Sequence, residues 1–146
     1  MRVVLTWGSS PSDLDSHLSY YPAGSGTHTY HISFGQKRFP STGTTVAALD
    51  VDGTNAFGPE TTSVYRLSST GTYRFSVYNW SAGGTGTSLS SSGAIVRVYD
   101  SKGLRATFGV PAGRIGGLWT VFTMSRGVIN PVNSVANLPN GSSSVP

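Results

Sequence analysis

Short stretches rich in Val, Ile, Thr, Tyr and Phe recur along the chain between clusters of Gly, Ser, Asn and Pro. No segment sustains the apolar i, i+3, i+4, i+7 spacing of a helix that faces a core. The pattern is typical of β-strands bounded by turns. It predicts eight or nine strands, Arg2–Trp7, Leu14–Tyr20, Thr27–Phe34, Thr45–Val51, Thr61–Leu67, Gly71–Trp80, Ala94–Asp100, Leu104–Val110 and Leu118–Met124, with a further short one near Val128–Val132.

The even spacing of these strands, with turns such as SSTG and GGTG between them, predicts an all-β fold. We expect an antiparallel two-sheet β-sandwich, of the jelly-roll or Ig-like kind, rather than a closed barrel. A chain of 146 residues suits one domain, which we place at residues 1–135. Residues 136–146 have the Ser, Pro and Gly content of a tail or linker. Trp7 and Trp119 are expected in the core.

The composition narrows the possible partners. Only 11% of the residues are charged, and the net charge of +4 comes from scattered basic residues, with Lys37 and Arg38 the only adjacent pair. This distribution argues against nucleic acid as a partner. No apolar run approaches the roughly 20 residues of a membrane-spanning helix, so membrane insertion is not expected. The absence of Cys excludes disulfides, thiolate metal sites and Cys catalysis.

Five of the six carboxylates fall in two short clusters. Because side chains alternate along a strand, Asp13 and Asp15 of PSDLDSH project to one side, and Asp50 and Asp52 of LDVDGTNAFGPE share a side. Glu60 follows a turn that curls back toward its origin. Carboxylates brought together without partners would repel one another, so we expect a positive charge among them.

The expected counter-charge is a hard divalent cation, Ca²⁺, which takes oxygen ligands from carboxylates, carbonyls and water. The predicted metal ligands are Asp13, Asp15, Asp50, Asp52 and Glu60. The alternative is that these residues cap turns through hydrogen bonds to the backbone and pair with Arg. The spacing does not fit an EF-hand.

The three histidines are not expected to bind the metal ion directly. His17 is expected to orient one Asp by a hydrogen bond, because Ca²⁺ rarely takes imidazole. His28 and His31 lie three apart on a predicted strand and so should point to opposite faces. This spacing argues against a zinc site shared with His17.

Four segments, LTWGSSPSDLDSHL, THTYHISF, LDVDGTNAFGPET and GTYRFSVYNW, resemble the YfaP-type domains of prokaryotic surface and secreted proteins. The hallmarks of that family are a D-x-D-L-H-like strand and a later G-P-E segment, and the resemblance covers roughly residues 2–100. It implies a β-sandwich, an extracytoplasmic location and an accessory or binding role. Ser16 departs from the motif, which has an apolar residue there. The resemblance places five residues on motif positions: Asp13, Asp15, His17, Asp52 and Glu60.

An enzymatic role is not expected. A glycosidase needs two acids that flank a cleft, and five grouped acids suit a cation better. The chain contains no G-x-S-x-G, no phosphate-binding glycine loop and no H-E-x-x-H.

The sequence therefore predicts a non-enzymatic calcium-binding β-sandwich module of a cell-surface or secreted protein. It would act in adhesion, in assembly or as an accessory domain, with other domains or subunits of a surface assembly as partners. One alternative is a carbohydrate-binding module that stacks polysaccharide on Tyr20, Tyr21 and Trp80. Another is a self-assembling extracellular filament or array subunit that uses strand addition.

Overall fold

Eleven β-strands build the molecule, and the computed structural model describes all residues, 1–146. One 3₁₀ turn at Ser142–Ser144 is the only helical element. No helix has the length and apolar character that crossing a membrane requires. The strands are β1 (Arg2–Thr6), β2 (Asp15–Tyr21), β3 (Tyr30–Ile32), β4 (Arg38–Phe39), β5 (Ala47–Val51), β6 (Glu60–Val64), β7 (Thr72–Tyr78), β8 (Ile95–Asp100), β9 (Gly103–Gly109), β10 (Leu118–Ser125) and β11 (Val128–Ala136).

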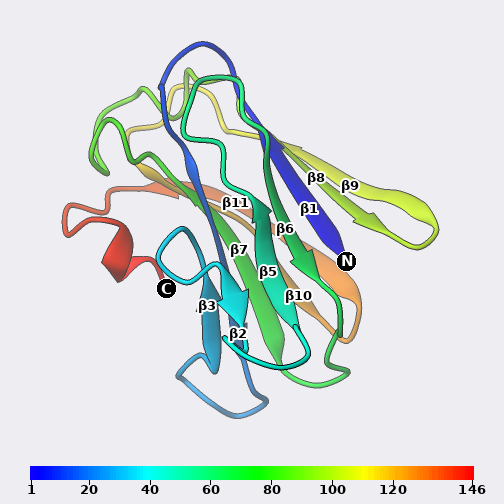
Figure 1. The fold of residues 1–146 in the computed structure, drawn as a ribbon. Helices are drawn as coiled ribbons and strands as arrows, with labels where there is room; N and C mark the ends of the chain where they lie inside the picture. The colour runs from blue at the N-terminus through cyan, green and yellow to red at the C-terminus, as the bar shows by residue number, and fades with distance from the viewer.

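The strands form two antiparallel sheets (Figure 1). One has six strands in the order β4-β5-β6-β1-β8-β9, and the other has five in the order β11-β10-β7-β2-β3. The chain passes repeatedly from one sheet to the other, so that β1 pairs with β6 and β8, and β7 pairs with β2 and β10. Each sheet is therefore built from strands that lie far apart in the sequence.

One hydrophobic cluster of 22 buried residues draws on strands of both sheets. Its aromatic centre is Phe122 of β10, which stacks on Phe75 of β7 and on Phe108 of β9, each at 5.6 Å between ring centroids. Trp7 and Trp119 are both buried here, as the sequence predicted. Burial of apolar side chains from both sheets holds the sheets together.

The two antiparallel sheets confirm the coarse fold prediction, but the strand count of eight or nine is wrong, because there are eleven. β4 has two residues, too few to show any alternation in the sequence. β11 runs for nine residues and contains Pro131, which suits its place at the edge of a sheet.

Residues 138–146, which we call the C-terminal segment, fold back onto the five-stranded sheet near β2 and β3 (Figure 1). Val145 is buried against Tyr78 and Leu118. The Ser19 hydroxyl of β2 donates a hydrogen bond to the Pro146 carbonyl at 3.0 Å. These contacts cover the face of the sheet that points away from the main core.

We expect Phe75→Ala to lower the free energy of unfolding by about 3–5 kcal/mol, because it removes a fully buried ring and leaves a cavity. Leu104→Ala is the control, since Leu104 is 57% exposed on the edge strand β9. The control should change stability by no more than about 0.5 kcal/mol. Urea unfolding of both variants measures the difference, and equal losses would contradict this account of the core.

Candidate metal centre

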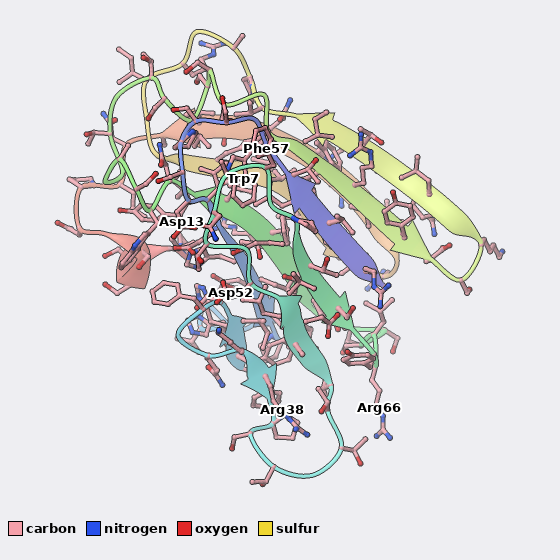
Figure 2. All side chains as sticks on the ribbon, turned by 45° about the horizontal axis from the view of Figure 1, so that its top comes forward. Trp7, Asp13, Arg38, Asp52, Phe57 and Arg66 are labelled. Carbon is pink, nitrogen blue, oxygen red and sulfur yellow. The ribbon has the colours of Figure 1, made fainter.

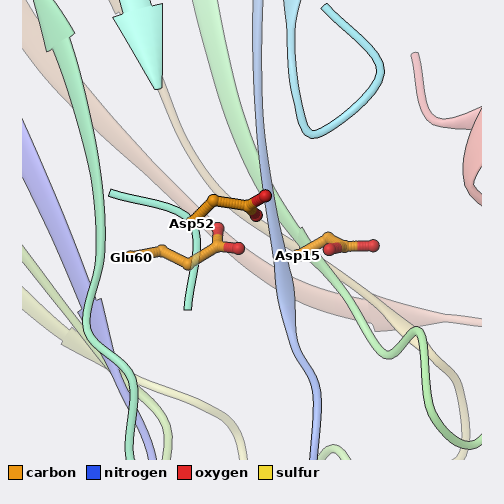
Figure 3. A group of neighbouring side chains, drawn as sticks. All are labelled: Asp15, Asp52 and Glu60. Carbon is orange, nitrogen blue, oxygen red and sulfur yellow. The ribbon is translucent and has the colours of Figure 1, made fainter. Parts of the chain in front are cut away.

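Three carboxylates from separate parts of the chain lie close to one another beside the start of β2 (Figure 3). Asp15 begins β2, Asp52 follows the end of β5, and Glu60 begins β6. One oxygen from each lies within 4.8 Å of the others. The cluster therefore joins β2 of the five-stranded sheet to β5 and β6 of the six-stranded sheet.

The loop between β5 and β6 brings Asp52 and Glu60 together because glycines let its backbone close. A Cβ atom on Gly53 would lie 2.7 Å from the Pro59 carbonyl oxygen, so the two ends of the loop approach at a distance that only glycine permits. Gly58 has φ +74°, and a Cβ there would lie 2.7 Å from the Trp7 ring. The loop is thus fixed against the end of β1.

The carboxylates of Asp15 and Glu60 are buried, and some of their oxygens have no hydrogen-bond partner. Asp15 is 4% exposed and Glu60 is 1% exposed. The Ser16 N–H donates to Glu60 Oε2 at 2.6 Å. Glu60 Oε1, Asp15 Oδ2 and Asp13 Oδ1 are buried without a hydrogen-bond partner. A buried polar atom without a partner costs free energy, so the site favours a group that would contact these oxygens.

Asp13 belongs to the same site. It lines a small cavity of about 170 Å³ together with Asp15, Asp52, Thr54 and two aromatic residues. The positive charge that reaches the cluster is Lys37, whose Nζ lies 2.6 Å from Asp52 Oδ2. Lys37 is exposed, and one solvated ammonium cannot balance a buried group of carboxylates.

The alternative prediction, that the acids of the cluster pair with arginines, finds no support in the ion pairs. Neither of the two ion pairs joins an arginine to the cluster. Asp13 lies nearer to Trp7 than to Arg38 or Arg66, and Asp52 lies between Trp7 and Arg38 (Figure 2). The ion pair that Asp52 forms is with Lys37. The sixth carboxylate, outside the cluster, does form such a pair: Asp100 and Arg105 are 2.6 Å apart.

Burial raises the pKa values of three carboxyl groups at this site. Burial, with Asp13 and Asp52 adding repulsion, raises the pKa of Asp15 to about 7. Burial raises the pKa of Glu60 to about 9, although the hydrogen bonds from Ser16 oppose the rise. The pKa of Asp13 is also raised, first by burial and then by Asp52. Without a cation, protons are therefore the groups that neutralise this site.

Asp50 lies outside the cluster, although the sequence predicted it as a fifth ligand. The pairing of β5 with β6 shifts register between Leu49 and Val51, so the simple alternation that grouped Asp50 with Asp52 does not hold. Asp50 is exposed, and its Oδ1 accepts a hydrogen bond from the Tyr65 hydroxyl at 2.6 Å.

The histidines are arranged differently from the prediction. His17 is buried and contacts His31, with 2.7 Å between His17 Nδ1 and His31 Nε2, rather than orienting an Asp. The prediction that His28 and His31 point to opposite faces is wrong, because β3 begins only at Tyr30 and leaves His28 in the preceding loop. The rings of His28 and His31 are 5.5 Å apart. Sequence spacing gave no signal for this histidine cluster.

The aromatic residues proposed for sugar stacking do not form one surface. Tyr20 packs on Tyr30 and Tyr73 near one end of β2. Tyr21 pairs with Thr72 at that same end. Trp80 follows the other end of β7, where it is 50% exposed beside the acidic cavity.

Two solved structures match nearly the whole chain. One, at 23% identity and a TM-score of 0.64, is a homologue of the telluride resistance protein TerD from Streptomyces coelicolor A3(2), and the match covers 94% of this chain and 89% of that one. The other is a protein of unknown function, SAV2460, at 21% identity and a TM-score of 0.61, covering 92% and 91%. The chain has a TerD-like fold. No family model and no curated protein matches it.

These neighbours overturn the function predicted from the sequence. The interpretation as a calcium-binding cell-surface or secreted module for adhesion or assembly is wrong, because the matching structures are a TerD homologue and a protein of unknown function. The carbohydrate-binding and filament alternatives gain no support and are set aside with it. The resemblance to YfaP-type domains, and the extracellular location it implies, stay predictions.

We expect the metal-free protein to lose stability as the pH rises from about 4 to about 9. Over this range the folded state holds protons on Asp15 and Glu60 that the unfolded chain has already released, so the free energy of unfolding falls with pH. The stabilisation is complete below the unfolded pKa values and is lost on passing pH 7 and then pH 9. Its total is on the order of several kcal/mol.

Urea unfolding in EDTA at several pH values measures this dependence. Asp15→Asn, which cannot ionise, should make the fall of stability less steep below pH 7, and the part that Glu60 contributes should remain. Stability that rises between pH 5 and pH 8 in EDTA would show that the buried carboxylates do not retain protons.

Proposed function

We propose that the protein is a non-enzymatic cation-binding domain that holds one hard divalent cation, Ca²⁺, among its buried carboxylates. The observation that carries this proposal is the convergence of Asp15, Asp52 and Glu60 oxygens within 4.8 Å, with buried oxygens of Asp15 and Glu60 left without partners. A cation would satisfy these oxygens and would replace the protons that otherwise neutralise them.

The donor set matches Ca²⁺ better than other common ions. Ca²⁺ accepts six to eight oxygen ligands in a flexible arrangement, including carboxylates that bind through one or both oxygens. Asp15, Asp52 and Glu60 would contact the ion directly, and Asp13 in the same cavity offers a further carboxylate. Zn²⁺ favours imidazole and thiolate, which the cluster lacks. Mg²⁺ demands near-ideal octahedral geometry and usually keeps several waters.

The ion would act as a link between the two sheets. Its ligands begin β2 on one side and flank the β5–β6 loop on the other, so binding would hold this end of the molecule together. We propose that the sheets pack face to face as a β-sandwich, which the shared hydrophobic cluster supports. An ion that binds only the folded state adds stability by mass action.

The TerD homologue raises the question of tellurium. That protein is a homologue of a telluride resistance protein, and at 23% identity the likeness of this chain to it extends to the fold alone. Buried carboxylates repel anions, so this site does not favour direct binding of an anionic tellurium species. We therefore propose the cation as its ligand.

We expect millimolar Ca²⁺ to raise the midpoint of thermal unfolding at pH 7.5. An ion at one hundred times its Kd adds about 2.7 kcal/mol, which corresponds to about 5–10 °C for a domain of this size. Asp52→Asn should remove the response, because it deletes one converging carboxylate. Differential scanning calorimetry with Ca²⁺ and with EDTA measures both effects.

Asp50→Asn is the matched control, since it makes the same chemical change on an exposed carboxylate that bonds Tyr65. It should keep the full Ca²⁺ response. An equal response in Asp52→Asn and the unaltered protein, or none in either, would reject the site. Asp15→Asn gives a second check, because it should stabilise the metal-free protein while abolishing the response to Ca²⁺.

A further inference from the structure

Two imidazole nitrogens face each other beneath the C-terminal segment, in a place distinct from the carboxylate cluster. His17 of β2 and His31 of β3 approach to 2.7 Å between Nδ1 and Nε2, with their rings nearly perpendicular at 87°. His17 is 2% exposed. A cavity of about 260 Å³ borders both rings and is also lined by Ser142 and Ser143 of the C-terminal segment.

The surrounding hydrogen bonds indicate which ring nitrogens of His17 and His31 carry a proton. Ser19 donates its single hydroxyl proton to the Pro146 carbonyl oxygen at 3.0 Å, so its oxygen accepts from His31 Nδ1 at 3.3 Å. His31 Nε2 consequently carries a lone pair that faces His17. His17 Nδ1–H donates to that lone pair, which leaves His17 Nε2 as a bare acceptor, buried without a partner.

We propose that His17 Nδ1 and His31 Nε2 form a second metal site, for a transition-metal ion of the Zn²⁺ or Cu²⁺ class. Imidazole nitrogen is the ligand that these ions favour, whereas Ca²⁺ favours the oxygens of the first cluster. Ser19 and the Pro146 carbonyl would orient the His31 ring through its other nitrogen, the arrangement that metal-binding histidines typically show.

Binding of a metal ion would require little rearrangement of the His17 and His31 rings. The proton of His17 moves from Nδ1 to Nε2, so both facing nitrogens offer lone pairs and neither ring changes its charge. Because His17 Nε2 has no partner beforehand, this shift breaks only the bond between the two rings. Two nitrogens at about 2.0–2.1 Å from one tetrahedral ion lie about 3.3 Å apart.

The rings must therefore separate by roughly 0.6 Å. The structure permits this, because His31 lies on β3, a three-residue strand at the edge of its sheet. The adjacent cavity leaves room for water or a further ligand. His28 lies on an exposed loop with its ring 5.5 Å from that of His31, but it does not line this cavity and is not one of the proposed ligands.

Calorimetric titration with Zn²⁺ and electron paramagnetic resonance with Cu²⁺ test the proposal. The Asp52→Asn variant, which lacks one carboxylate of the first site, should still bind one Zn²⁺ per chain, and bound Cu²⁺ should show coupling to imidazole nitrogen. His31→Gln should abolish Zn²⁺ binding and the nitrogen coupling. Ser19→Ala should weaken the affinity by about 10- to 100-fold, as losses of orienting partners do.

His28→Gln is the control on an exposed histidine of the same cluster and should retain binding. Equal Zn²⁺ affinity in His31→Gln and the unaltered protein, loss of binding in Asp52→Asn, or no binding at all would overturn the proposal and leave a hydrogen-bonded imidazole pair only. If His31→Gln does not fold, ¹⁵N resonances of the unaltered protein decide: Zn²⁺ should shift His17 Nδ1 and His31 Nε2, and unshifted resonances would reject the site.

Discussion

Negative charge buried where the two sheets meet is the constraint on which the candidate site depends. Asp15 and Glu60 are the two buried acidic residues of the chain, and they come from different sheets. Their mutual repulsion would open this end of the molecule if both were ionised and nothing positive lay between them. Protons or a cation must therefore be present for the sheets to close.

The polar layer at this junction extends beyond the carboxylates and explains an unusual residue. Ser16 stands where the resembled motif has an apolar side chain, yet it is 2% exposed. Its N–H binds Glu60, and its hydroxyl lies 3.1 Å from the Thr62 hydroxyl of the opposite sheet. An apolar residue could fill the space but could not bond Thr62, so Ser16 completes a hydrogen-bonded contact between the sheets.

The sequence predicted the residue types of the site better than it predicted where each side chain lies. The clustering of carboxylates predicted four residues that do gather, Asp13, Asp15, Asp52 and Glu60, because charge repulsion makes such grouping informative. Period-two alternation failed at Asp50, where a register shift intervenes. It failed again at His28, because the strand predicted over Thr27–Phe34 contracts to three residues. Both failures are local backbone events that side-chain patterns do not encode.

The cellular role could not be predicted from the sequence, and the reason is physical. A group of carboxylates specifies which ligand is attracted but carries no information about the setting in which that ligand is used. The surface-module interpretation added adhesion and location to a charge pattern that supports only cation binding. The fold comparison overturned the role in adhesion or assembly, and the extracellular location stays a prediction. The charge pattern of the cluster does not depend on either.

Strand β2 connects the carboxylate cluster to the histidine pair through its alternation. Asp15, His17 and Ser19 are spaced two apart, and they contact in turn the acidic cluster, His31 and the C-terminal segment. Oxygen and nitrogen donors thus follow one another along a single strand whose position is fixed by β7 on one side and β3 on the other. A shift of this strand by one residue would turn all three side chains toward the core and replace them with Ser16 and Leu18. The packing of Leu18, which is fully buried, therefore sets the register that places both groups of donors.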